Sequence, residues 1–177
     1  VGVLFRLKEK NAHSIFGAIA DELRKDGVEL IAATPWLEPI MPGAGFALGP
    51  RLTAEQRADV AFGHRIAVEV SRLEIGQTVV VKEGTILAVE AFEGTDKAIR
   101  RAGRLGGKGS VVVKVAKKGH DMRFDIPVIG MRTLKTLRKA KVSAIALEAG
   151  RTILLERERV IDEADRMGLA MISVAVD

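Results

Sequence analysis

Two clusters of acidic residues have the types and spacing that metal-assisted chemistry on phosphates needs. The first cluster lies in Glu90-Ala91-Phe92-Glu93-Gly94-Thr95-Asp96, between a predicted strand and a predicted helix. Helix capping by Thr95 or Asp96 explains only one of its three acids. The set therefore fits the hard oxygen ligands that magnesium prefers. A capped, solvated loop is the alternative interpretation of this segment when it is taken alone.

The second cluster is Asp121-Met122-Arg123-Phe124-Asp125. In an extended strand, side chains alternate between the two faces, so Asp121, Arg123 and Asp125 share one face. Two carboxylates on that face suit a cation, and the guanidinium between them suits the oxygens of a phosphate. The alternative is an edge strand that carries a local salt bridge.

The charge distribution favours an anionic ligand. From Lys97 to Lys141 the sequence holds 14 Lys or Arg and two acids, whereas the remainder holds 14 bases and 21 acids. Such a field attracts polyanions, phosphorylated ligands or an anionic lipid surface. A set of solvated helix faces is the other explanation. The sequence contains no Cys, which excludes disulfides, thiol nucleophiles and Cys-based metal sites.

The elements that position these clusters predict an α/β fold in two parts. Residues 1–46 are interpreted as the end of a Rossmann-like N-terminal domain, with a helix over 14–25, a strand over 28–33 and an apolar linker over 34–46. Residues 51–177 are interpreted as a separate α/β catalytic domain with a mixed sheet. Its predicted helices cover 53–72, 97–104, 131–140 and 156–167, and its strands cover 78–81, 85–89, 110–116, 143–147, 152–155 and 170–176.

Several motifs in order resemble one enzyme family. They are Glu93-Gly94-Thr95-Asp96 followed by Arg100 and Arg101, Lys114 in Val-Val-Val-Lys-Val, Asp121-Met-Arg-Phe-Asp-Ile-Pro with Gly130 and Thr133, and Ala144-Ile-Ala-Leu-Glu-Ala-Gly150 with Thr152. The family is that of the UDP-2,3-diacylglucosamine pyrophosphatases of the LpxI type. The resemblance covers 53–177, and 1–46 as the end of the family's N-terminal domain. His120 stands where the family commonly has Gln.

The resemblance implies a magnesium-dependent hydrolase that cleaves the pyrophosphate bond of UDP-2,3-diacylglucosamine to lipid X and UMP in lipid A synthesis. It also implies a cytoplasmic homodimer, peripheral to the inner membrane. Carried over residue by residue, it assigns catalysis to Asp125, Asp121 and Glu93, and metal binding to Asp125, Asp121, Asp96 and Glu93. The expected substrate-binding residues are Arg123, Lys114, Arg101, Thr95 and Gly94. Which carboxylate binds the metal and which acts as a base stays open.

The main rival interpretation is a non-catalytic binder of phosphorylated ligands or nucleic acid, acting through the basic segment 97–141. Binding phosphate alone gives no role to four acids near the same surface. An aromatic content of 4% without any Tyr argues against stacking on bases, so no nucleic-acid partner is expected. An enzyme that transfers the phosphoryl group to an alcohol is a second rival. For the acyl chains of a lipid substrate, the candidate contacts are the linker around Trp36 and Phe46 and the apolar side of the helix over 54–72; docking between domains is the other interpretation of the linker.

Overall fold

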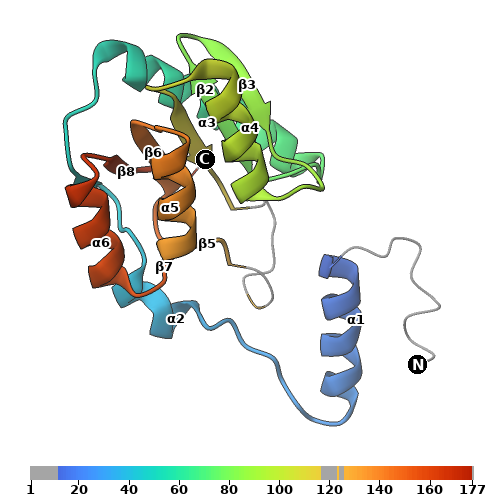
Figure 1. Ribbon diagram of the computed structural model, residues 1–177. Coiled ribbons are helices and arrows are strands. Elements are labelled where there is room, and N and C mark those ends of the chain that lie inside the picture. The colour runs from blue at the N-terminus through green and yellow to red at the C-terminus, as the bar shows by residue number, and fades with distance from the viewer. Residues whose placement is uncertain (1–11, 117–122, 124–125, 177) are drawn as a thin grey trace.

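The computed structural model describes residues 12–116, 123 and 126–176. Its centre is a six-stranded sheet in the order β1-β8-β6-β4-β2-β3 (Figure 1). The strands are β1 (Ala47–Leu48), β2 (Thr78–Lys82), β3 (Thr85–Val89), β4 (Val111–Lys114), β6 (Ala144–Glu148) and β8 (Ala170–Val174). A second, two-stranded parallel sheet pairs β5 (Val128–Ile129) with β7 (Ile153–Leu154).

Strand directions confirm the predicted mixed sheet. Strands β4, β6 and β8 are parallel, while β2 runs antiparallel to both β4 and β3. Strand β3 therefore has the same direction as β4. The carboxyl ends of β3, β4, β6 and β8 consequently lie along one edge of the sheet, together with the first residue of β2. Ligands of open α/β sheets bind at that edge.

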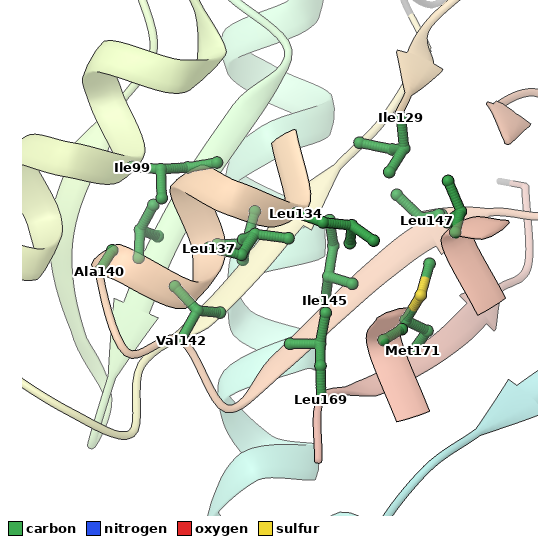
Figure 2. Packing of buried hydrophobic residues seen from close by; sticks show 14 of the residues in the cluster. Ile99, Ile129, Leu134, Leu137, Ala140, Val142, Ile145, Leu147, Leu169 and Met171 are labelled. Atoms are coloured by element: carbon green, nitrogen blue, oxygen red, sulfur yellow. The ribbon is translucent and has the colours of Figure 1, made fainter. Parts of the chain in front are cut away.

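Helices cover both faces of the sheet, which gives three layers. Helix α3 (Ala54–Arg72) covers one face, and α4 (Thr95–Gly106), α5 (Met131–Lys139) and α6 (Arg157–Arg166) cover the other. Alternation along the strands divides the core accordingly. Val79, Val113 and Ala146 face α3, whereas Val80, Val112 and Ile145 face the other three helices. Figure 2 shows Leu134 and Leu137 of α5 beside Ile145, with Ile99 of α4 nearby.

The predicted start of the first long helix is confirmed in detail. Thr53 Oγ1 accepts a hydrogen bond from the Gln56 amide at 3.1 Å, and Gln56 Oε1 accepts one from the Thr53 amide at 2.9 Å. This reciprocal capping box satisfies two amides that a helix end otherwise leaves without partners. Gln56 Nε2 also donates to Ser143 Oγ at 3.0 Å, which fixes the start of α3 beside the start of β6.

The N-terminal part departs from the prediction. Helix α1 (Ala12–Lys25) is confirmed, but the strand predicted over 28–33 is wrong, because these residues pair with no strand in the described chain. Val28 and Ile31 are instead 51% and 61% exposed. The predicted linker contains a short helix, α2 (Thr34–Leu37), and the 3-10 turn η2 (Glu38–Ile40). A proline lies in the first turn of each, where a missing N–H is tolerated.

The assignment of 1–46 to a Rossmann-like domain stays a prediction. Two strands were missed in the sequence, β1 and β5, because two-residue strands carry no periodicity. Phe46 packs against the main core, while Trp36 is 68% exposed. In the described part of the chain, no helix is both long and apolar enough to cross a bilayer.

Candidate active site at the carboxyl edge of the sheet

Lys114 is the buried centre of the candidate site. It is the last residue of β4, and only 7% of its surface is exposed. Its Nζ donates to Thr95 Oγ1 at 2.9 Å and lies 3.5 Å from Thr78 Oγ1. Lys114 and Thr78 lie close together because Thr78, the first residue of β2, pairs directly with Lys114 across the antiparallel β2–β4 strands. The structure thus brings Lys114 and Thr95, both predicted to bind substrate, into direct contact.

Glu90 completes a partly buried polar chain with these residues. Thr95 Oγ1 donates to Glu90 Oε1 at 2.9 Å, so the hydroxyl accepts from Lys114 and donates to Glu90. The second carboxylate oxygen, Glu90 Oε2, is buried and has no hydrogen-bond partner in the described structure. A buried carboxylate oxygen without a donor is costly unless water or a cation serves it. Glu90 belonged to the first acid cluster but was not among the predicted site residues.

The amino end of α4 forms a small open hollow beside this chain. Gly94 precedes the helix with a φ of +83° and gives it no side-chain cap. The Lys97 amide donates to the Gly94 carbonyl, but the Thr95 and Asp96 amides are available to an anion, and the helix dipole favours negative charge there. The hollow measures about 320 Å³ and is lined by Glu93, Gly94, Thr95, Asp96, Lys97, Arg100, Arg132 and Thr133. Phosphate fits this combination of amides and cations.

Two arginines hold the acids at this helix end. Arg101 donates to Glu93 Oε1 at 2.5 Å and to the Val89 carbonyl at 2.9 Å. The hydrogen bond from Arg101 keeps the pKa of Glu93 below its ordinary value of 4.5. Arg132, at the start of α5, donates to Asp96 Oδ2 at 2.8 Å. Arg132 joins the amino ends of α4 and α5, although sequence analysis gave it no role in the site.

Glu148 is a second buried carboxylate at the same edge, and sequence analysis did not select it. It ends β6 with 3% of its surface exposed, and its Oε2 accepts from the Ala116 amide at 2.8 Å. His64 Nε2 lies 3.8 Å from Oε1, and Arg151 lies 3.9 Å from Oε2. Ala116 directly precedes the segment with the second acid cluster. Glu148 therefore fixes the position of Ala116, just past the end of β4.

Asp121 and Asp125 lie outside the described residues, so their predicted roles are untested. Arg123 is described within a turn, and one of its guanidinium nitrogens lies 3.4 Å from the Leu30 carbonyl oxygen. In the described part of the chain, no three acidic or His side chains gather as a metal site. A magnesium ion would nevertheless suit the hard, buried oxygen of Glu90 that lacks a donor. Asp121 and Asp125 would have to supply further ligands.

A larger hollow of about 880 Å³ lies at the opposite edge, where strands β4, β6 and β8 begin. Asp59, Glu83, Lys108 and Ser143 are among its lining residues. Asp59 accepts hydrogen bonds from the amides of Glu83 and Gly84, which anchors the β2–β3 turn. None of the predicted site residues that the structure describes lines this hollow. The candidate site is therefore the hollow at the amino end of α4, because Thr95, one of its lining residues, contacts both the buried Lys114 and the carboxylate of Glu90.

Comparison with known proteins gives one matching family and one similar curated protein. The sequence profile of the family described as LpxI C-terminal domain matches residues 43–172. UDP-2,3-diacylglucosamine pyrophosphatase LpxI of Caulobacter vibrioides is 34% identical over 173 residues, which cover 93% of this chain. The chain spans 62% of the length of that relative.

Similarity to solved structures is weak. RibD of Acinetobacter baumannii is 14% identical with a TM-score of 0.41, and the match covers 69% of this chain and 36% of RibD. The dCMP deaminase of cyanophage S-TIM5 is also 14% identical, with a TM-score of 0.38, over 70% of this chain and all of the deaminase. Neither similarity bears on the chemistry of the site.

Proposed function

This chain belongs to the family of LpxI C-terminal domains, and we propose that it hydrolyses the pyrophosphate bond of UDP-2,3-diacylglucosamine. The products would be UMP and 2,3-diacylglucosamine 1-phosphate, which is lipid X. The observation that carries the proposal is the partly buried Lys114–Thr95–Glu90 hydrogen-bond chain, which reaches an uncapped helix terminus with three cations and two carboxylates around it. The similarity to a protein named as this pyrophosphatase supports the choice of substrate.

The α4 terminus would hold one phosphate of the substrate. Amides that follow Gly94 would donate to its oxygens, and the Arg132 and Lys97 side chains would offset its charge. Lys114 is too deeply buried to serve as a mobile surface cation. Its role would be to fix the Thr95 hydroxyl and to place a positive charge beneath the phosphate, where low solvent exposure strengthens its effect.

Hydrolysis requires that water attack one phosphorus while the bridging P–O bond breaks. We propose that Asp121 and Asp125 orient this water and hold magnesium, with Glu93 and Asp96 in support. Glu90 would add its buried oxygen to the set. Magnesium, when bound, would neutralise phosphate charge and polarise the water. Arg101 and Arg123 would stabilise the charge that develops on the leaving phosphate, once substrate competes for the contacts that they make in this structure.

The proposed substrate also indicates where in the cell the protein acts. We propose a cytoplasmic enzyme at the inner-membrane surface, because the substrate carries two acyl chains. A homodimer is proposed from the family resemblance alone, and size-exclusion chromatography with light scattering tests it.

Product identification tests the proposed reaction. The chain and the longest natural form of the protein are incubated with UDP-2,3-diacylglucosamine and magnesium, and products are identified by mass spectrometry. UMP and lipid X in equal amounts are expected. Transfer to an added alcohol instead of water would reassign the enzyme to the transferases. Intact substrate with both forms would reject catalysis.

A further inference from the structure

Helices α4 and α5 lie side by side (Figure 1). Their charged side chains are almost all positive. Helix α5 contains no acid, and the single acid of α4 is Asp96, which already pairs with Arg132. The exposed cations on the two helices that have no carboxylate partner in the described structure are Lys97, Arg100, Arg104, Lys135 and Lys139.

Other helices of the same protein carry acidic side chains among the basic ones. Helix α6 interleaves its acids and bases along Arg157–Arg166, and Arg72 of α3 pairs with Glu69 at 2.9 Å. Interleaving is usual for a helix face that only meets water, since like charges one turn apart repel each other. The α4–α5 face keeps this repulsion without compensation, and a surface of opposite charge would remove it.

A hollow between the two helices concentrates part of this charge. It measures about 400 Å³ and is lined by Arg100, Gly103, Arg104, Lys139 and Ala140. Its floor is a close helix contact, because a Cβ atom at Gly103 would lie only 2.7 Å from Ala140 Cβ. Three cations around a hollow of this size match a phosphate head group.

Exposed apolar side chains flank the candidate active site at the amino ends of the same helices. Phe92 is fully exposed two residues before Gly94, and Leu155 is 53% exposed. Leu155 lies beside the start of α5, because a Cβ atom at Gly130 would be 3.6 Å from Leu155 Cβ. Cations next to exposed apolar side chains are the pattern of a surface that binds the interface of an anionic membrane.

We propose that the α4–α5 face docks the protein on an anionic bilayer, with phosphate head groups between α4 and α5 and with Phe92 and Leu155 at the acyl boundary. Docking in this orientation sets the amino ends of both helices, and thus the candidate site, at the level of the head groups. The link between docking and catalysis rests on the proposed function, because it assumes that the substrate is a lipid with a diphosphate group. The docking face itself does not depend on it. Each cation near such a surface strengthens binding by about fivefold.

Vesicle cosedimentation without substrate tests the face independently of catalysis. Vesicles contain phosphatidylcholine alone or with phosphatidylglycerol, and circular dichroism verifies folding. The Arg104→Glu, Lys139→Glu pair should weaken binding to the anionic vesicles by at least about twentyfold. The matched control, Arg65→Glu with Arg72→Glu on α3, makes the same charge change on the opposite face of the sheet and should weaken binding less than threefold.

If the two double variants lose vesicle binding equally, the loss reflects net charge and the docking face is overturned. Equal binding of the wild type to neutral and anionic vesicles would also overturn it. A Phe92→Trp substitution in a Trp36→Phe background gives a second measurement, because its fluorescence should shift to the blue on anionic vesicles. An unchanged spectrum would remove Phe92 from the interface. If the protein binds anionic vesicles through this face but releases no UMP from the substrate, the proposed reaction is rejected and the docking face stands.

Discussion

Lys114 and Thr95 are 19 residues apart in the sequence, yet Lys114 Nζ lies 2.9 Å from Thr95 Oγ1 beneath the amino end of α4. Lys114 comes from the centre of the sheet, and Thr95 is the first residue of the helix that follows β3. The contact thus couples the buried sheet to the helix end that would hold a phosphate. The first two predictions concern this coupling.

Lys114→Met keeps the length of the side chain and removes its charge. We expect kcat to fall at least about a hundredfold, because a preorganised charge near the reacting group is lost. Rates of UMP release measure this effect. Lys82→Met is the matched control, since Lys82 lies on the neighbouring strand and donates to the Gly106 carbonyl at the other edge. A similar loss in both variants would show general damage to the sheet.

Glu90→Gln tests the orphaned carboxylate oxygen. The amide keeps the shape but replaces an anionic oxygen that lacks a donor with a neutral group. If Glu90 serves a cation, the magnesium concentration for half-maximal activity should rise at least about tenfold. Glu83→Gln, in the exposed β2–β3 turn, should leave the magnesium dependence unchanged. An unchanged magnesium dependence in Glu90→Gln would remove Glu90 from the metal site.

Glu93→Gln removes the carboxylate that Arg101 binds. Since the folded-state pKa of Glu93 lies below 4.5, the charged form stabilises the fold fully above that value, and the contribution fades as pH falls through the lowered pKa. Urea unfolding should therefore show the variant slightly less stable than the wild type at pH 7. The difference should disappear in acid. A constant difference down to pH 3 would contradict an effect of this ionisation.

Gly103→Ala tests the packing of α4 on α5. An added Cβ would lie 2.7 Å from Ala140 Cβ, so the helices must separate. We expect a loss of about 1–3 kcal/mol in the free energy of unfolding, as is typical of overpacked contacts. Gly17→Ala in α1 is the control, because nothing lies within 4 Å of its added Cβ. Equal stability of the Gly103→Ala variant and the wild type would show that the two helices adjust without strain.

Much of the fold of residues 51–176 could be predicted because local patterns determine it. The capping box at Thr53 and the apolar runs of β4 and β6 are complete within a few residues. The strand expected over 28–33 was wrong because an apolar run forms a strand only where another strand is available for pairing. Strands β1 and β5 were too short to detect.

Local sequence patterns could predict the candidate site only where its members are neighbours in sequence, whereas Lys114 and Arg101 were named through the family resemblance. Gly94, Thr95 and Asp96 lie together at the start of α4, and their predicted position at a strand-to-helix junction is confirmed. The pairing of Arg132 with Asp96 and of Glu148 with the Ala116 amide depends on the sheet order, which no local pattern specifies. Glu90 belonged to the first acid cluster in the sequence, but only its contact with Thr95 connects it to Lys114.

The initial rate of UMP release from UDP-2,3-diacylglucosamine tests the central claim most directly. It is measured for the wild type and Asp125→Ala, each with magnesium and with EDTA. Release should require magnesium and fall at least about a hundredfold in the folded variant. Release that persists in EDTA, or at the wild-type rate in Asp125→Ala, would contradict a magnesium-dependent site at this edge of the sheet.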